Sequence, residues 1–255
     1  MAWSERQRAM LGRMGLRVWQ PSAVAAPEPA GEPELERIAA PASAQAVAAQ
    51  AVAAPPSAVA TLDWPALQAA VAACRACSLC ESRTQTVFGV GHHEADWMVV
   101  GEAPGEQEDM RGEPFVGPAG QLLDSMLRAL GLSRAGEGPA AERVYIANTL
   151  KCRPPRNRNP APEEMAKCEP FLVRQIELVK PRIILAMGRF AVQALLRSSE
   201  AVGKLRGRVH SYQGVPLVVT YHPAYLLRNL PDKARAWEDL CLAATVAERP
   251  SGAST

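Results

Sequence analysis

The chain has 255 residues, of which 48% are apolar, and a formal net charge of +2. This length and apolar content suffice for one or two domains with a buried core, and the nearly balanced charge excludes a protein that coats nucleic acid by bulk charge. No apolar run is long enough to cross a bilayer, and the first ten residues hold no signal-peptide core, so we expect a cytoplasmic protein.

The first sixty residues differ in composition from the rest of the chain. Residues 1–20 contain a short basic, amphipathic stretch that ends in Trp19, and residues 21–60 are rich in Ala, Pro, Val and Glu without an aromatic side chain. Such a segment buries too little apolar surface to offset its ordering entropy, so we expect a disordered linker. The basic, amphipathic stretch that precedes this linker is either a peptide that docks on a partner or a terminus without that role.

A globular domain is predicted over residues 61–248, followed by a frayed tail at 249–255. Its first helix is expected at 65–73, after a capping residue among Thr61 to Asp63. Apolar runs then predict strands, and amphipathic segments predict helices between and after them. The strands are expected at 97–100, 144–147, 183–187 and 217–220, and the helices at 121–130, 162–179, 189–196 and 235–247. This alternation predicts a parallel sheet with helices on both faces.

The segment 101–120 directly follows the first predicted strand. It reads as a loop with five glycines, three prolines and five acidic side chains. A long Gly-rich loop after a buried strand is typical of a binding site in an open α/β sheet, although an ordinary surface connection is the alternative. The segment has neither the G-x-G-x-x-G pattern of dinucleotide binding nor the Gly-Lys-Ser/Thr ending of a phosphate-binding loop.

Four cysteines form two pairs with different spacings. Cys74 and Cys77 are separated by two residues, and Cys152 and Cys168 by fifteen. Four thiolates suit either a tetrahedral zinc ion or an iron–sulfur cluster, and the wide second pair favours the cluster. Of the two remaining cysteines, we expect Cys80 to be a spare thiol and Cys241 to lie in the core.

Polar side chains also follow two other predicted strands. Asn148 comes after the strand at 144–147, and His222 comes shortly after the last strand. Because parallel strands bring their carboxyl ends to one edge of a sheet, both residues should face the loop at 101–120. A lone histidine is more often structural than functional, but this position favours a functional role for His222.

Four groups of residues together resemble the motifs of one enzyme family. They are Gly101-Glu102-Ala103-Pro104-Gly105, then Pro114-Phe115-Val116-Gly117 with Ala119-Gly120, then Asn148 with Lys151-Cys152-Arg153-Pro154-Pro155, and finally His222-Pro223-Ala224-Tyr225-Leu226-Leu227-Arg228. In this order, and together with the four cysteines, they resemble a family 4 uracil-DNA glycosylase over about residues 74–242.

The resemblance implies a three-layer α/β/α sandwich around the four-stranded parallel sheet. It also implies a [4Fe–4S] cluster as cofactor, with Cys74, Cys77, Cys152 and Cys168 as its metal ligands. The implied reaction is hydrolysis of the N-glycosidic bond of deoxyuridine in DNA, which releases uracil and leaves an abasic site during base-excision repair.

The resemblance also implies how uracil would be held. Phe115 would offer an aromatic face, Asn148 would read the N3–H and O4 edge, and the backbone at Glu102 and Ala103 would bind the other polar edge. His222 would stabilise the negative charge that develops on O2 when the bond breaks.

Contacts to DNA are expected outside the uracil pocket. Leu226 or Leu227 would fill the gap that the flipped base leaves, and Arg228 would lie near a phosphate. Lys204 and Arg206 belong to a basic strip that would grip the backbone, unless the strip is only a solvated turn.

One position departs from the wider pattern. Family 1 relatives carry a water-positioning aspartate in the first loop where this chain has Ala103, so another group is needed. Glu102 and Glu108 are the candidates for this catalytic role, and Glu108 could instead exclude the methyl group of thymine. Relatives that capture uracil covalently carry Gln in place of Ala103 and a basic loop ending in His. We therefore expect turnover here.

The substrate partner implied is uracil-containing DNA, single- or double-stranded, and we expect a monomer. Residues 14–19, Met-Gly-Leu-Arg-Val-Trp, resemble the N-terminal peptide by which the psi subunit of the bacterial clamp loader binds the chi subunit. The residues 4–20 would then bind a replisome protein. The alternatives to a glycosylase are a noncatalytic iron–sulfur protein that binds DNA or serves as a replisome adaptor, and a structural zinc protein.

Overall fold

The structure is a computed structural model, and it describes residues 59–135 and 138–248. The peptide expected at 1–20, nearly all of the linker and the tail at 249–255 lie outside these residues and stay predictions. None of the helices in the described ranges is both long and apolar enough to span a membrane.

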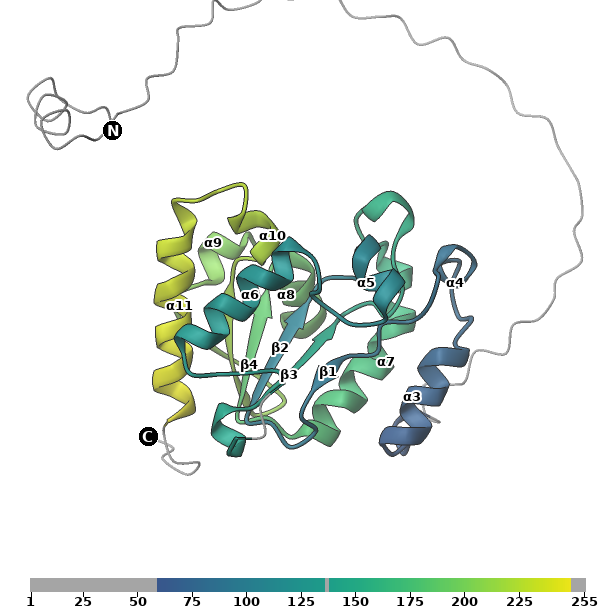
Figure 1. The fold of residues 1–255 in the computed structure, drawn as a ribbon, viewed down its shortest axis with the longest axis horizontal. Helices are drawn as coiled ribbons and strands as arrows, with labels where there is room; N and C mark the ends of the chain where they lie inside the picture. The colour runs from purple at the N-terminus through teal and green to yellow at the C-terminus, as the bar shows by residue number, and fades with distance from the viewer. Residues whose placement is uncertain (1–58, 136–137, 249–255) are drawn as a thin grey trace, which may run out of the picture. The chain divides into compact units, whose positions relative to one another are not determined.

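A single six-stranded sheet, in the order β1-β3-β2-β4-β6-β5, forms the centre of the domain (Figure 1). The strands are β1 (Val90–Gly91), β2 (Trp97–Gly101), β3 (Val144–Asn148), β4 (Ile183–Met187), β5 (Val209–Tyr212) and β6 (Val215–Thr220). The four predicted strands are β2, β3, β4 and β6, and all of them are parallel to their neighbours within this set.

The sheet has six strands, so the expected count of four is wrong, and it is mixed because its two edge strands are antiparallel. Two short edge strands, β1 and β5, pair antiparallel with β3 and β6. The first has only two residues, and the second is largely exposed, so neither carries the continuous apolar run that identifies a buried strand.

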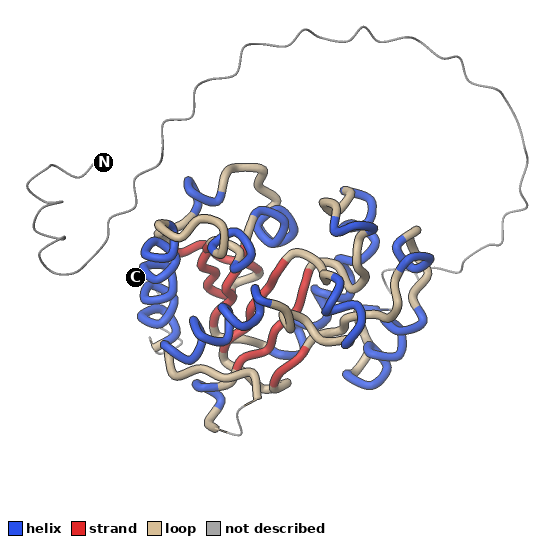
Figure 2. Tube along the Cα trace, turned by 45° about the horizontal axis from the view of Figure 1, so that its top comes forward, coloured by secondary structure: helices blue, strands red, loops and turns tan. Residues whose placement is uncertain are grey.

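Helices cover both faces of the sheet, which confirms the α/β sandwich (Figure 2). They are α3 (Trp64–Ala73), α4 (Leu79–Ser82), α5 (Glu106–Arg111), α6 (Pro118–Ala129), η1 (Ala140–Glu142), η2 (Pro155–Asn157), α7 (Pro162–Val179), α8 (Arg189–Leu196), α9 (Val202–Leu205), α10 (Pro223–Leu226) and α11 (Asp232–Ala247). Apolar side chains of α7 and α8 pack on one face, and those of α6 and α11 pack on the other.

The segment expected as a loop at 101–120 contains a short helix. Helix α5 starts after Gly105 and ends at Gly112, whose φ of +78° is a left-handed conformation that favours glycine. The segment has no apolar periodicity because only one residue of α5, Asp109, is buried, and it accepts hydrogen bonds from the backbone N–H of Thr84 through both carboxylate oxygens at 3.0 Å.

Cys241 is exposed on α11, so its expected place in the core is wrong. Its neighbours Leu240 and Ala243 face the sheet, and a helical step of one residue turns Cys241 away from them.

Arg206 joins two elements and does not project freely. Its side chain contacts the carboxylates of Asp239 and Glu238 at 3.0 and 2.9 Å, and the side chain of Asp239 is fully buried. Asp239 also accepts a hydrogen bond from the backbone N–H of Gly207 at 3.1 Å. The guanidinium therefore neutralises a buried carboxylate, which is a structural role.

We expect the substitution Arg206→Ala to lower the free energy of unfolding by about 3–5 kcal/mol, because it leaves the buried Asp239 carboxylate unpaired. Urea unfolding measures the change. The control is Arg208→Ala, an exposed cation in the same turn, which should change the free energy by less than about 0.5 kcal/mol. Equal stabilities of the two variants would contradict the structural role of Arg206.

Candidate active site

The carboxyl ends of the parallel strands meet at one edge, as their register requires. Gly101 at the end of β2 lies opposite Asn148 at the end of β3, and β4 and β6 end in register beside them. A cleft of about 870 Å³ opens at this edge. Its lining includes Glu102, Ala103, Phe115, Asn148, His222 and Arg228, so the structure brings these predicted site residues together.

The carboxylate of Glu108 holds the first loop in shape. Its Oε2 accepts a hydrogen bond from the backbone N–H of Gly105 at 3.1 Å, and its Oε1 accepts from the N–H groups of Val116 and Gly117 at 2.9 and 3.1 Å. One side chain thus ties together the two ends of the segment around α5. Since both oxygens are used, Glu108 is a positioning residue for this loop.

Phe115 has a backbone conformation that requires glycines around it. Its φ is +56°, and a Cβ atom at Gly120 would lie 1.7 Å from the carbonyl oxygen of Phe115. A Cβ at Gly101 would lie 2.6 Å from the Phe115 ring and 2.4 Å from Asn148 Oδ1. The ring stacks near the imidazole of His222, with 5.3 Å between centroids and 27° between planes. Two glycines therefore allow the aromatic ring to form one wall of the cleft.

Asn148 is buried, and its Oδ1 has no hydrogen-bond partner among the described residues. An unpaired buried oxygen costs free energy unless a ligand supplies the donor. The backbone of Asn148 is fixed, because its carbonyl oxygen accepts a hydrogen bond from the buried Nζ of Lys151 at 2.9 Å. Lys151 Nζ also donates to Gln175 Oε1 at 2.6 Å. Asn148 therefore supplies an unpartnered acceptor on a fixed backbone among the residues that line the cleft.

His222 is held in one tautomer. Its Nδ1 accepts a hydrogen bond from the backbone N–H of Ala224 at 3.2 Å, which leaves Nε2 as the protonated nitrogen of the neutral ring. Burial lowers the pKa of His222 to about 4, partly opposed by the carboxylate of Glu108. At neutral pH the residue is thus an uncharged N–H donor.

Glu102 lies half-buried at the start of the cleft. Burial raises the pKa of its carboxyl group, and the nearby Arg189 partly opposes this shift. Its carbonyl oxygen accepts a hydrogen bond from the backbone N–H of Leu150 at 3.1 Å, so the first loop is also attached to the segment after β3.

The residues expected to contact DNA fall into two groups. Leu227 is 42% exposed, and Arg228 and Lys204 are exposed as well. Leu226 is 1% exposed because it faces the protein from the short helix α10, so it cannot insert into DNA from this position. Arg206 pairs with two carboxylates, as described above, and is not available to a phosphate.

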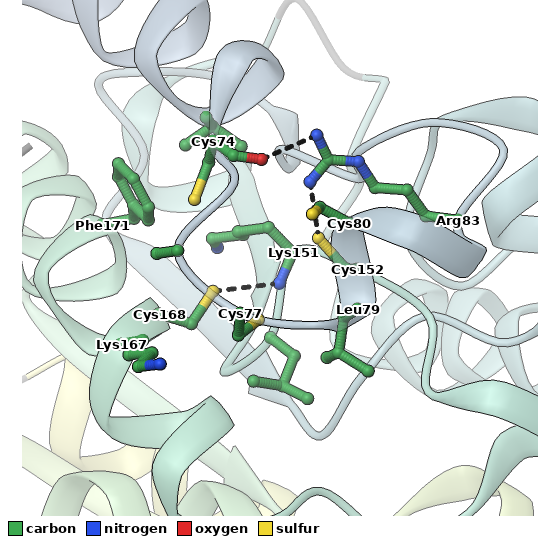
Figure 3. Close-up of a pocket in the computed structure, with 13 residues that line it drawn as sticks. Cys74, Cys77, Leu79, Cys80, Arg83, Lys151, Cys152, Lys167, Cys168 and Phe171 are labelled. Carbon is green, nitrogen blue, oxygen red and sulfur yellow. Dashed lines mark hydrogen bonds between the residues drawn. The ribbon is translucent and has the colours of Figure 1, made fainter. Parts of the chain in front are cut away.

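The four predicted cysteine ligands line one cavity beside the sheet (Figure 3). The first two come from the segment between α3 and α4, the third from the segment after β3 and the fourth from helix α7, and apolar residues such as Leu79 and Phe171 complete the wall. Cys80 lines the same cavity, although it was expected to be spare. Among residues 59–135 and 138–248, no three His, Cys, Asp or Glu side chains are arranged to hold a single metal ion.

Hydrogen-bond donors point at two of the sulfur atoms, as Figure 3 shows. Arg83 Nη1 donates to Cys152 Sγ at 2.9 Å, and the backbone N–H of Lys151 donates to Cys168 Sγ at 3.2 Å. Burial raises the pKa of Cys77 and Cys152, and it raises the pKa of Cys168 to about 12. A soft cation is the group that would displace these protons. The thiols, the apolar wall and the donors to sulfur fit an iron–sulfur cluster.

Several cleft residues were missed by sequence reasoning. Arg189 follows β4 through Gly188, so the rule that located Asn148 and His222 would also have located it. Tyr221 and Tyr225 flank His222 and line the cleft, but an aromatic residue in a short motif is not distinguished from a core residue by sequence. Asn157 and Arg158 reach the cleft from the segment before α7, which no strand-end rule covers.

Fold and site together define a class of protein. It is an α/β protein whose cleft offers an aromatic face, a buried amide and a neutral imidazole, which are the groups that recognise a planar ring with a polar edge. A separate cavity gathers cysteine thiols. Residues 88–241 match the family model described as the Uracil DNA glycosylase superfamily.

The chain is similar to three type-4 uracil-DNA glycosylases. It is 44% identical to that of Archaeoglobus fulgidus over 165 residues, which are 62% of this chain and 79% of the relative. It is 44% identical to that of Thermotoga maritima (64% and 82% covered) and 40% identical to that of Pyrobaculum aerophilum (71% and 93% covered). The chain therefore belongs to the uracil-DNA glycosylase superfamily and, within it, to the type-4 family.

We expect Glu108→Gln to lower the free energy of unfolding by about 1–3 kcal/mol, because an amide offers one acceptor where three N–H donors need two. Hydrogen exchange at the amides of Gly105, Val116 and Gly117 should accelerate with it. The matched control is Glu106→Gln, whose side chain is 66% exposed and 3.7 Å from Arg153. Unchanged exchange at all three amides in Glu108→Gln would show that the carboxylate does not hold the loop.

Proposed function

We propose that this protein is a DNA repair enzyme that hydrolyses the N-glycosidic bond of deoxyuridine in DNA and releases free uracil. Membership of the family supports this function. The observation that carries it at the level of residues is the unpartnered Oδ1 of buried Asn148, in a cleft that also contains Phe115 and an uncharged His222.

The target nucleotide must leave the base stack before it reaches this cleft, at a cost of a few kcal/mol. Asn148 Oδ1 would accept the N3–H of uracil, and its Nδ2 would donate to O4. Cytosine presents the opposite pattern at these positions, and each unsatisfied buried group costs about 1–3 kcal/mol. Phe115 would cover one face of the ring, and the backbone at Glu102 and Ala103 would meet the remaining polar edge.

Bond breaking moves an electron pair from the C1′–N1 bond onto uracil, while positive charge develops on the sugar. The Nε2–H of His222 would donate to O2, where much of the negative charge gathers. This role needs a neutral imidazole that donates without giving up its proton, and the lowered pKa of His222 supports it.

Water must add to C1′ to complete hydrolysis. We propose Glu102 as the group that positions it, because Glu102 lines the cleft and its carboxyl group is half-buried. Glu108 was the other candidate for this role and for exclusion of the thymine methyl group. Its three hydrogen bonds to backbone N–H groups favour a positioning role in the loop.

DNA would bind along the open side of the cleft. Leu227 would fill the gap left by the flipped base, and Arg228 and Lys204 would contact phosphates. The exposure of all three side chains supports this assignment, whereas Leu226 is buried and Arg206 is paired with two carboxylates.

We propose that Cys74, Cys77, Cys152 and Cys168 hold a [4Fe–4S] cluster. These four cysteines would tie the segment after α3, the segment after β3 and helix α7 together through the cluster, so we assign the cluster a structural function. Arg83 would stabilise the thiolate of Cys152, and the backbone at Lys151 would stabilise that of Cys168.

We further propose that residues 4–20 bind a replisome protein, on the sequence of residues 14–19 alone. A noncatalytic DNA-binding or adaptor protein is the alternative to a glycosylase, and uracil release separates the two.

The first test is release of free uracil from a single-stranded oligonucleotide with one deoxyuridine. The wild-type protein should release it, and His222→Ala should do so about 10²–10³-fold more slowly, as expected for loss of one donor to developing charge. The control is His93→Ala, an exposed histidine that stacks on Trp64 outside the cleft. No release by iron-loaded wild-type protein would refute the glycosylase function.

The pH dependence tests the charge state of His222. Since the pKa of His222 is about 4, its imidazole should become protonated, and uracil release should decline for that reason, only as the pH approaches 4. The unfolded chain binds the proton below about pH 6.5, so the free energy of unfolding should rise from pH 4 to 6.5, and this slope should be smaller in His222→Ala. Uracil release that increases as the pH falls through 6.5 would indicate a cationic imidazole instead.

The third measurement concerns the cluster. We expect Cys152→Ser to lower the iron content, the visible absorption and the soluble yield together with activity, because the metal stabilises the fold. Cys241→Ser, at an exposed position, should keep all four, and Cys80→Ser should keep the iron. A stable, iron-free and inactive Cys152→Ser protein would contradict a structural function, and zinc in place of iron would contradict the cluster.

A further inference from the structure

The cleft is larger than the proposed uracil site needs. Its volume of about 870 Å³ is near the upper end of the volumes of pockets that hold drug-sized ligands. A single pyrimidine base is much smaller than a drug-sized ligand. Phe115, Asn148 and His222 account for one part of the cleft. Tyr221, Tyr225 and the start of α9 at 201–203 line the cleft as well, and the reaction assigns no ligand to them.

Tyr221 and Tyr225 form an aromatic pair in the cleft. Their ring centroids are 5.1 Å apart with 18° between the planes, which is a stacked arrangement. Tyr221 lies directly between β6 and His222, and Tyr225 lies on α10. The pair is therefore adjacent in the chain to the imidazole that contacts the proposed base.

The outer ring of the pair is exposed but fixed. Tyr225 is 36% exposed, and its hydroxyl donates to Asp232 Oδ2 at 2.7 Å. Asp232 in turn accepts from Arg235 at 3.0 Å. The hydroxyl of Tyr221 lies only 3.4 Å from where a Cβ of Gly203 would be, so the start of α9 packs closely against it. Because the hydroxyl of Tyr225 is already satisfied, its ring is left as a preorganised apolar surface in the cleft.

We propose that Tyr221 and Tyr225 form a second base-binding subsite, on which the nucleobase next to the flipped deoxyuridine stacks. The inference rests on the proposed function, since it is this reaction that brings DNA into the cleft. Stacking on an aromatic ring is tolerant of sequence because every base has a π-face. A neighbouring base is free to stack in single-stranded DNA, whereas in a duplex it must first leave its own stack. The subsite therefore favours single-stranded substrates.

The test compares three single-stranded oligonucleotides that each contain one deoxyuridine. One has ordinary neighbours, and the others have a tetrahydrofuran abasic residue directly 5′ or 3′ of it. For wild-type protein, kcat/KM should fall about tenfold on one of the two abasic substrates, as expected for loss of one stacked base. In Tyr225→Ala, kcat/KM should be about tenfold lower than wild type on the ordinary substrate. It should not fall further on the abasic substrate to which the wild-type protein is sensitive.

Three comparisons keep the test specific. Tyr225→Phe retains the ring and should restore the sensitivity to the missing neighbour, whereas Tyr225→Leu should resemble Tyr225→Ala. Trp237→Ala removes an exposed aromatic ring outside the cleft and should change neither rate. Iron content and thermal unfolding confirm that each variant is folded.

The outcomes separate the subsite from the function. Wild-type release at equal rates from all three substrates would overturn the subsite and leave the glycosylase function intact. If Tyr225→Ala lowered kcat/KM relative to wild type by the same factor on every substrate, the subsite would also be overturned. Loss in Tyr225→Phe as large as in Tyr225→Ala would assign the effect to the Asp232 hydrogen bond, against stacking. Absence of uracil release from every substrate would refute the function itself.

Discussion

The buried ammonium group of Lys151 is the constraint on which both sites depend. It donates to the carbonyl oxygen of Asn148 and to Gln175 Oε1, and Gln175 donates in turn to the hydroxyl of Tyr145 and the carbonyl of Phe88. Burial lowers the pKa of Lys151 to about 8, and negative charge on Cys168 and Cys152 would oppose this shift. A buried cation is costly unless it is hydrogen-bonded and neutralised. The cysteine cavity and the cleft are thus joined through one side chain, and the cysteines that we propose as cluster ligands would also stabilise the cation that holds Asn148.

A second constraint acts on the aromatic wall of the cleft. The left-handed backbone of Phe115 is possible because Gly120 leaves room for its carbonyl oxygen, and the carboxylate of Glu108 binds the next two backbone N–H groups. Strained backbone of this kind persists only where the surroundings determine it fully. Glu108 would therefore contribute to the proposed recognition of the base by holding the loop, although the loop backbone occupies both of its oxygens.

Sequence periodicity and strand-end geometry located most of the sheet and the centre of the cleft. Buried parallel strands are continuous apolar runs, so β2, β3, β4 and β6 are visible in the sequence, and the edge they share places Asn148 and His222 together. The edge strands β1 and β5 lack such runs. Which side of a four-residue helix faces the protein depends on packing, and this decided between Leu226 and Leu227. The ion pair of Arg206 with Asp239 joins residues more than thirty positions apart, and sequence spacing gives no signal for such a contact.

The proposed roles place selectivity and affinity in different parts of the cleft. The group proposed to distinguish uracil from cytosine is the buried amide of Asn148, where an unmatched hydrogen bond costs the most because no water replaces it. The exposed cations and aromatic rings lie outside this part, where contacts to phosphate and to any base are tolerant of sequence. A repair enzyme must meet its target base among many different neighbours, so contacts that bind DNA strongly should not read the neighbouring bases. The proposed recognition at the strand ends, combined with sequence-tolerant binding along α10 and the start of α9, would satisfy both requirements.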